Sequence, residues 1–498
     1  MKNIFRNSLY NGIGFIFPAA VTFFTTPYIV YKLTPQIYGI YFLTTSMIGM
    51  MSFLDFGFGQ GIIKFVSQYQ AQKNYSRINK IIGMSVLFCL GMGLTGGILI
   101  WLSAEYMVNH VFHIAPGYAP TAVSAFRIAA FGFVFYLMNG IFSNLSVAIQ
   151  RYDIFVKVQY TFWFFSTVAA VALLYLGKDL TAILKAQIFF QILAIVCFYF
   201  ISRKLLPYFR VVFNFESAVF KEMFNFSFFT AINSITGDIV FRVDKMIIGA
   251  LLGMEAITYY QIPFLVVQLA SRFINAIAQL LFPTISSLDA VGNKVKIKEI
   301  YLRSSRYVVA MSFVVTSGLV MLGHSFISIW MGAEFAEKVR FVMPVIAIVF
   351  FFVSVAIPAY WFYNGLGYAS INMFSSLFGA GAYLIAAFFL ISSYKLIGAA
   401  MAFAFILLPA PFYFYKLHKV IGIETRWLVN LLLKLVVPLL IMWELQSVLF
   451  IPSGLFALIA SSLVIFFISI SILIFLRVIL LSDWNDLKIS MRLEFAKK

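Results

Sequence analysis

Four ionisable residues occur within eight positions of an otherwise apolar segment, residues 223–251. They are Asp238, Arg242, Asp244 and Lys245. At about 100° per residue, Asp238, Arg242 and Lys245 share one helix face, whereas Asp244 points elsewhere. Charges inside a membrane helix are costly and usually face a bundle interior or a water-filled cavity. The planar guanidinium of Arg242 could bind phosphate oxygens. Alternatively, it forms a structural i,i+4 pair with Asp238, and Lys245 lies in a wet kink.

The following apolar segment, residues 257–287, carries a narrow polar stripe. Its members fall within about 60° of one another on a helical wheel, and they are Gln261, Gln268, Arg272, Asn275, Gln279 and Ser286. Such a stripe would be costly against lipid, so it should face water or another helix. Amides suit a path for hydroxyl-rich ligands, and the alternative is hydrogen bonding between helices.

A third candidate region is the sequence LDFGFGQG, which contains Asp55. Asp55 could be a proton or cation site, a partner for an arginine of the other lobe, or a residue that reaches water near the inner interface. The nearby Gly57, Gly59 and Gly61 permit close packing or local unwinding. Arg127, toward the outer end of its segment, completes the set of candidate residues.

Fourteen apolar segments must position these residues. The chain has 498 residues, of which 62% are hydrophobic and 11% charged, a composition that a water-soluble domain could not bury. A bilayer core about 30 Å thick needs about 20 apolar helical residues per crossing. We predict spans at residues 10–31, 37–63, 81–103, 121–149, 158–176, 180–201, 223–251, 257–287, 307–331, 341–363, 373–391, 396–415, 427–447 and 455–481.

Lysine and arginine are distributed unequally between the connections. With both termini inside, 24 of the 36 basic residues fall on the inner side and 5 on the outer side. This is the positive-inside pattern, so the net charge of +18 reflects cytoplasmic loops beside anionic lipid and does not indicate nucleic-acid binding. We therefore expect a multi-pass protein with both termini cytoplasmic.

The N-terminal run and the two cysteines suggest nothing further. Lys2 and Arg6 precede an apolar run that continues to Val30 without a convincing cleavage site, so we expect a retained first helix. Cys89 and Cys197 fall within predicted spans, where thiols behave as small apolar groups. We expect neither a disulfide nor a metal site from them.

The two halves of the chain contain similar elements at a spacing of about 220 to 230 residues. Ile37-Tyr38-Gly39-Ile40-Tyr41 resembles Ile257-Thr258-Tyr259-Tyr260, and each is followed by a long span and a basic loop. Six spans separate them, so the halves would be related by an axis along the membrane normal. Chance similarity is the alternative. The predicted domains are a six-helix lobe at 1–222, a second at 223–416, and two further helices with a cytoplasmic tail at 417–498.

Two stretches resemble a known family. RNSLYNGIGFIFPAAVTFFTTPYIVYKLTPQIYGIYFLTTSMIGMMSFLDFGFGQGIIKFVSQY resembles the first two helices of bacterial polysaccharide-biosynthesis flippases, and DIVFRVDKMIIGALLGMEAITYYQIPFLVVQLASRFINAIAQLLFPTISSL resembles their seventh and eighth. These flippases belong to the multidrug/oligosaccharidyl-lipid/polysaccharide exporter superfamily. The resemblance implies an all-α polytopic membrane protein with about 14 helices in two pseudo-symmetric six-helix lobes plus two C-terminal helices.

The resemblance also implies a function, a substrate and a location. The protein would pass an undecaprenyl-pyrophosphate-linked oligosaccharide, such as an O-antigen repeat unit, across the bacterial cytoplasmic membrane by alternating access, with a polysaccharide polymerase as a candidate partner. The predicted spans hold seven basic and four acidic residues, which favours an anionic substrate. Arg272 and Arg242 would bind the pyrophosphate, with Lys245 and Arg127 as further cations and the stripe amides along the sugar path. Asp55, Asp238 and Asp244 would be ion-coupling or structural charges.

Two other functions compete with this interpretation. A cation-coupled multidrug exporter of the same superfamily would be expected to carry an acidic excess within its spans. A membrane-embedded glycan polymerase or ligase would need a sizeable catalytic loop, but the longest outer connection, residues 104–120, has 17 residues. No nucleotide loop, metal cluster or catalytic triad stands out. We expect a transporter with no enzymatic activity, cofactor or metal.

Overall fold

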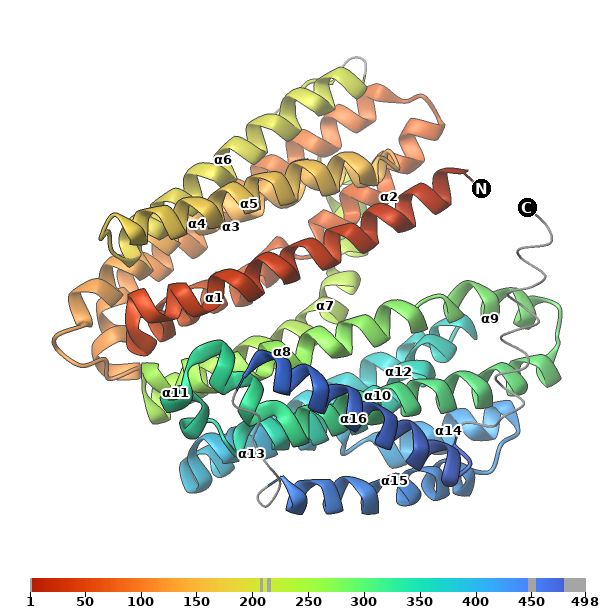
Figure 1. The fold of residues 1–498 in the computed structure, drawn as a ribbon. Coiled ribbons are helices and arrows are strands. Elements are labelled where there is room, and N and C mark those ends of the chain that lie inside the picture. The colour runs from red at the N-terminus through yellow and green to blue at the C-terminus, as the bar shows by residue number, and fades with distance from the viewer. Residues whose placement is uncertain (1, 207–208, 213–215, 447–453, 479–498) are drawn as a thin grey trace. The chain divides into compact units, whose positions relative to one another are not determined.

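The computed structural model describes residues 2–206, 209–212, 216–446 and 454–478 (Figure 1). At residues 2–16, 52, 218–219, 225–226 and 228–241 it describes the backbone alone. The described part of the chain is helical and contains no strand. It divides into two compact units, Met1–Thr258 and Tyr259–Lys498.

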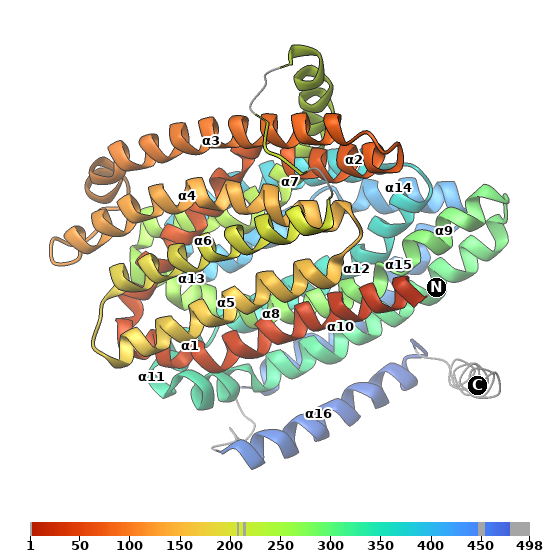
Figure 2. The same ribbon diagram turned by 90° about the horizontal axis from the view of Figure 1, so that it is seen from above.

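The N-terminal unit is a bundle of long helices. Figure 2 shows α3, α4, α6, α5 and α1 in this order across the bundle, and neighbouring members of the series pack together. α7 packs against α1 and α2. The helices are α1 (Lys2–Met50), α2 (Phe58–Ala71), α3 (Tyr75–Tyr106), α4 (Ala119–Ala148), α5 (Tyr152–Tyr175), α6 (Leu180–Leu205) and α7 (Ser217–Leu252).

The C-terminal unit is built around α10, which packs against α12, α15 and α16. Its core includes Tyr301, Phe313, Phe351, Phe362 and Leu435, each almost fully buried. α8 begins in the N-terminal unit and enters the C-terminal unit within its first turns. The helices are α8 (Met254–Ala278), α9 (Leu281–Ala290), α10 (Lys294–Met331), α11 (Ala333–Lys338), α12 (Val342–Gly365), α13 (Ala369–Ala402), α14 (Ala410–Ile421), α15 (Thr425–Leu445) and α16 (Leu455–Phe475).

Eleven helical segments in the described residues are long and apolar enough to cross a membrane. Two of them combine predicted neighbours: Phe17–Asp55 is kinked at Thr34, and Ala369–Ile421 has a break in helical geometry at Lys395. α7 corresponds to the predicted seventh span. The structure therefore confirms an all-α polytopic membrane protein with about 14 membrane helices.

The predicted domain boundary at 222/223 and the boundary between the compact units at Thr258/Tyr259 differ. The reason is physical: the predicted lobes follow the order of spans along the chain, whereas α7 packs with α1 and α2 in the N-terminal unit. The grouping of spans into lobes stays a prediction.

A structural repeat relates positions that lie 219 residues apart in the sequence, just below the predicted spacing. Thr34 and Gly253 both have positive φ, 68° and 87°, with extended ψ, 153° and 176°. Lys73 and Gly292 likewise have φ of 55° and 67°. Positive φ is uncommon outside glycine, so its recurrence at two equivalent pairs indicates a true internal repeat.

The helix caps follow the same repeat. The side-chain oxygen of Asn74 accepts the backbone N–H three residues later at 3.2 Å, and that of Asn293 does the same at 3.1 Å. These asparagines cap the starts of α3 and α10. We refer to residues 34–77 as copy 1 and residues 253–296 as copy 2.

The long span in each copy is interrupted, and the sequence indicated such an interruption only in copy 1, where Gly57, Gly59 and Gly61 permit local unwinding or close packing. In copy 1, a 3₁₀ turn, η1 (Met51–Asp55), leads to left-handed Phe56 and Gly57 before α2 begins. In copy 2, the break lies between α8 and α9. Residues 35–71 and 254–290 each comprise 37 residues, about 55 Å of helix, which exceeds a bilayer core of about 30 Å. Discontinuous membrane helices of this kind often flank ligand sites.

Candidate functional site

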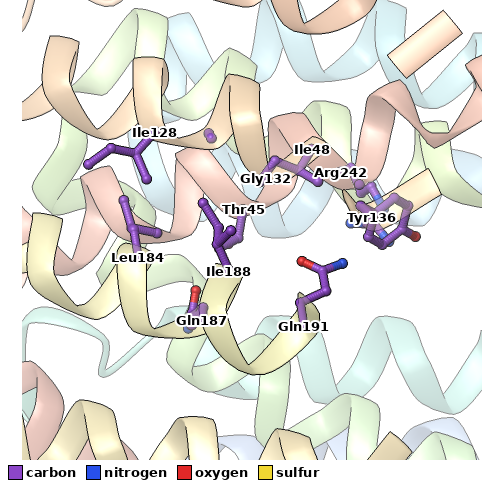
Figure 3. Close-up of a pocket in the computed structure, with 12 residues that line it drawn as sticks. Thr45, Ile48, Ile128, Gly132, Tyr136, Leu184, Gln187, Ile188, Gln191 and Arg242 are labelled. Carbon is purple, nitrogen blue, oxygen red and sulfur yellow. The ribbon is translucent and has the colours of Figure 1, made fainter. Parts of the chain in front are cut away.

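A cavity of about 210 Å³ lies within the N-terminal unit, between α1, α4, α6 and α7 (Figure 3). The side chains of Gln187 and Gln191 project from α6, and Arg242 reaches the cavity from α7. The complete described lining is Thr45, Ile48, Gly49, Ile128, Ala129, Gly132, Tyr136, Leu184, Gln187, Ile188, Gln191 and Arg242.

Arg242 occupies space that only a glycine leaves open. A β-carbon at Gly49 would overlap the Arg242 guanidinium, including its Nη1 and Cζ atoms. Gly49 lies on α1, so the guanidinium rests directly on the backbone of a neighbouring helix. Close contact with a glycine places the planar cation at the cavity wall and limits the positions that it can adopt.

Neutral polar groups accompany this cation. Gln187 Nε2 donates a 2.7 Å hydrogen bond to Tyr41 Oη, which orients the amide on the α6 side. Gln191, Thr45 and Tyr136 also contribute to the lining. Of the described lining residues Arg242 alone carries a charge at neutral pH, so the cavity combines a cation, amides and hydroxyls with apolar walls.

Lys245 and Asp244, two further charged residues of α7, form a buried ion pair. Lys245 Nζ lies 2.7 Å from Asp244 Oδ2, and the two side chains are 2% and 0% exposed. The lysine therefore bonds to the residue that the helical wheel placed on another face, because its flexible side chain reaches around the helix. Lys245 is not among the described lining residues of the cavity. The side chain of Asp238 lies outside the described residues, so its pairing with Arg242 stays a prediction.

In the C-terminal unit the predicted stripe divides into two parts. Gln261 is buried and Gln268 is half-buried, whereas Arg272, Asn275 and Gln279 are exposed. Asn275 Oδ1 accepts a 3.1 Å hydrogen bond from Trp361 Nε1 on α12. Gln279 lies in the break after α8. One amide thus bonds to another helix, while the cation in mid-stripe remains accessible.

Arg127 and Asp55 occupy two further positions in the N-terminal unit. Arg127 Nη2 lies 2.7 Å from Glu105 Oε1, and its guanidinium lies 4.8 Å from the ring centre of Trp101, which places it on the α3–α4 surface. Asp55 Oδ1 accepts the Gly57 backbone N–H at 2.5 Å, so this carboxylate helps to shape the break in copy 1. The predicted roles of both residues stay predictions.

Sequence reasoning missed several cavity residues, namely Gly49, Thr45, Tyr136, Gln187 and Gln191. The i,i+4 spacing of Gln187 and Gln191 in an apolar span was a signal of the same kind as the α8 stripe. No sequence signal identified Gly49, because its role depends on a side chain from another helix. Among the described residues, no group of three or more metal-ligating side chains is present.

Residues 32–340 match the model of a family described as polysaccharide biosynthesis protein. The match covers more than half of the chain. The chain belongs to this family. The resemblance predicted from the sequence is therefore confirmed.

Proteins similar to this chain agree with the assignment. A Shigella flexneri protein named "Putative O-antigen transporter" is 20% identical over 408 residues, which cover 81% of this chain and 94% of the relative. An inward-facing multidrug resistance MATE family transporter of the MOP superfamily has a TM-score of 0.69 at 11% identity, covering 81% of this chain and 94% of that structure. The lipid II flippase MurJ, in an inward closed conformation, has a TM-score of 0.69 at 13% identity, covering 93% and 98%. At these identities the structural likeness shows that the chain has the fold of this superfamily.

Proposed function

We propose that this protein is a flippase for an undecaprenyl-pyrophosphate-linked oligosaccharide, the repeat unit of an O-antigen or another surface polysaccharide. It moves this substrate from the inner to the outer face of the bacterial cytoplasmic membrane by alternating access. The observation that carries the proposal is the Arg242 guanidinium, seated over Gly49 in a cavity that also presents amides and hydroxyls.

The physical reason is the cost of moving a pyrophosphate through hydrocarbon. The anion would lose its hydration over about 30 Å, which is prohibitive without compensation. A guanidinium can replace water by binding two phosphate oxygens at once. Amides such as Gln187 and Gln191 supply neutral donors and acceptors for sugar hydroxyls, and the prenyl chain stays in lipid.

Arg272 is the second proposed phosphate ligand. It is exposed in mid-stripe on α8, with Gln268 one helical turn before it and Asn275 nearly one turn after it. The buried Asp244–Lys245 pair supports the fold in this proposal and does not bind the substrate. A polysaccharide polymerase that consumes the exported unit is the proposed partner.

Deletion of the gene in its own host tests the function. The deletion should leave lipid-linked oligosaccharide synthesis intact, accumulate the intermediate at the inner leaflet and abolish display of the surface polymer. Wild-type protein should restore display, and Arg242→Ala at equal abundance should not. Normal surface polymer together with hypersensitivity to cationic dyes would contradict the proposal and favour a multidrug exporter. Loss of the polymer with exported monomer in the outer compartment would favour a polymerase.

The orientation is tested separately by cysteine labelling. Both termini are proposed to be cytoplasmic because the basic connections then face inward. An impermeant reagent added outside should label cysteines at positions 117 and 334 but not at 74 or 293. Labelling at 293 from outside would overturn the orientation of the second half.

A further inference from the structure

The first turns of the two copies contact each other through equivalent positions. Thr258 Oγ1 donates a 2.6 Å hydrogen bond to the carbonyl of Pro35. In return, the Met254 carbonyl packs so closely on Gly39 that a β-carbon there would overlap it. Pro35 corresponds to Met254 and Gly39 to Thr258 at the 219-residue spacing. The first residue of each pair in one copy thus contacts the second in the other copy, and this reciprocity is characteristic of two-fold symmetry.

This reciprocal contact lies within the N-terminal unit and is deeply buried. Thr258 is 0% exposed and Met254 is 2% exposed. Both turns begin at a residue with positive φ, Thr34 in one copy and Gly253 in the other. The start of α8 is therefore held to the N-terminal unit by a hydrogen bond and by backbone packing that tolerates no side chain at Gly39.

The next residue of α8 is held to the other unit. Tyr259 Oη accepts a 2.8 Å hydrogen bond from Lys338 Nζ on α11, and its ring centre lies 4.9 Å from that of Phe335. The two compact units divide between Thr258 and Tyr259. Consecutive residues of one helix are thus anchored to different units.

The helix is weakened at this same boundary. Pro263 lies inside α8, four residues after Tyr259. Because proline has no backbone N–H, the Tyr259 carbonyl lacks its helical donor, and bends concentrate at such positions. Thr258 and Tyr259, which contact different units, and Pro263, which removes a helix hydrogen bond, therefore lie within two turns of α8.

We propose that residues 258–263 of α8 form a hinge on which the C-terminal unit moves relative to the N-terminal unit. The reciprocal contact of the two turns fixes the N-terminal end of the hinge. Tyr259 couples the hinge to α11, and the helix bends at Pro263. Gly39, Thr258 and Pro263 are positioning residues: in this proposal they influence the movement of the two compact units and do not contact the substrate. The use of the hinge in transport rests on the proposed function, but its existence does not.

Distance measurements between spin labels test the hinge without any substrate. Labels at exposed positions 73 and 296, one in each unit, would be placed in a cysteine-free protein in nanodiscs. Wild-type protein should give a broad or two-component distance distribution. Pro263→Ala restores the helical donor and should reduce the minor component several-fold. Pro438→Ala, the same change in α15 within the C-terminal unit, is the matched control and should leave the distribution unchanged.

The reciprocal contact has its own pair of variants. Thr258→Val removes the hydroxyl and should shift the distribution, whereas Thr258→Ser keeps the donor and should restore the wild-type form. Thr258→Val preserves the side-chain size and Thr258→Ser loses a single methyl group, so both variants should still accumulate. Distributions identical to wild type in both Pro263→Ala and Thr258→Val would overturn the hinge. An intact hinge in a protein that fails the surface-polymer test would overturn the proposed function alone.

Discussion

Copy 1 and copy 2 keep the same frame but differ in the middle of the long span. Their positive-φ turns and their asparagine caps coincide at the 219-residue spacing. Between these fixed points, Gly49 of copy 1 corresponds to Gln268 of copy 2, and Phe53 corresponds to Arg272. Copy 1 therefore lacks the first four polar residues of the copy 2 stripe and leaves room for a cation from α7, whereas Gln60 and Ser67 match the last two, Gln279 and Ser286.

The difference shows that the same repeated backbone can position an arginine in two ways. In copy 1 the cation comes from a neighbouring helix and lies over Gly49 in a cavity. In copy 2 it belongs to the span itself and stays exposed on α8. A cation held by close packing is preorganised, whereas water screens the charge of an exposed one.

The largest expected effect is at Arg242. Arg242→Ala should reduce transport by about 100-fold, because two charge-assisted hydrogen bonds to phosphate are together worth about 3 kcal/mol. Arg242→Lys should recover only part of it, since an ammonium acts as a point charge. Transport by purified protein in liposomes, at matched abundance, measures the loss.

The predicted pairing with Asp238 requires a separate control. Asp238→Asn combined with Arg242→Gln removes both charges at once. If the two residues form only a structural pair, this double variant should accumulate and transport normally. A phosphate site predicts normal accumulation without transport.

At Arg272 we expect a smaller loss. Arg272→Ala should reduce transport by about tenfold, because an exposed cation is worth less than a buried one. Abundance should remain at the wild-type level, and Arg272→Lys should recover part of the activity. Full transport by Arg272→Ala would show that copy 2 does not contribute to phosphate binding, and Arg242 would then be the remaining proposed ligand.

Gly49→Ala sharpens the comparison further. The added methyl displaces the end of a flexible side chain, so stability should change by less than about 1 kcal/mol while transport falls several-fold. Gly140→Ala on α4 is the control, because a β-carbon there would meet no described neighbouring atom within 4 Å. Equal transport by both variants would show that the close contact between Arg242 and Gly49 is not needed for transport.

The smallest effect concerns the shared frame. Asn74→Ala and Asn293→Ala should each destabilise the protein by about 1 kcal/mol through loss of a helix cap. Thermal unfolding in detergent should show similar shifts, with transport unchanged. A large difference between the two shifts would mean that the copies are not equivalent in energy, although they share geometry.

Much of the architecture follows from the sequence for clear physical reasons. A bilayer requires long apolar helices, so span positions are readable from composition alone. The repeat was visible in a few residues around Gly39 and Thr258, and the glycines after Asp55 indicated local unwinding, which the structure confirms at η1. Arg242 was also identified, because a charge in an apolar segment requires a special environment.

The contacts between helices could not be predicted in the same way. A helical wheel gives the direction of a Cβ but not what lies opposite, so the role of Gly49 was invisible. It also ignores the reach of long side chains, and for this reason the Asp244–Lys245 pair was missed. The bond from Trp361 to Asn275 likewise depends on the packing of α8 against α12, which no local pattern specifies.

The charges of α7 also bear on how the protein enters the membrane. At the middle of a helix, each Asp, Lys or Arg opposes insertion by about 2.5–3.5 kcal/mol, so a segment with Asp238, Arg242, Asp244 and Lys245 would leave the translocon poorly by itself. α7 packs against α1 and α2, which the ribosome delivers first, and Gly49 of α1 receives the Arg242 guanidinium. We therefore expect α7 to insert stably only after α1 and α2 are in place, because packing against them lowers the cost of its charges.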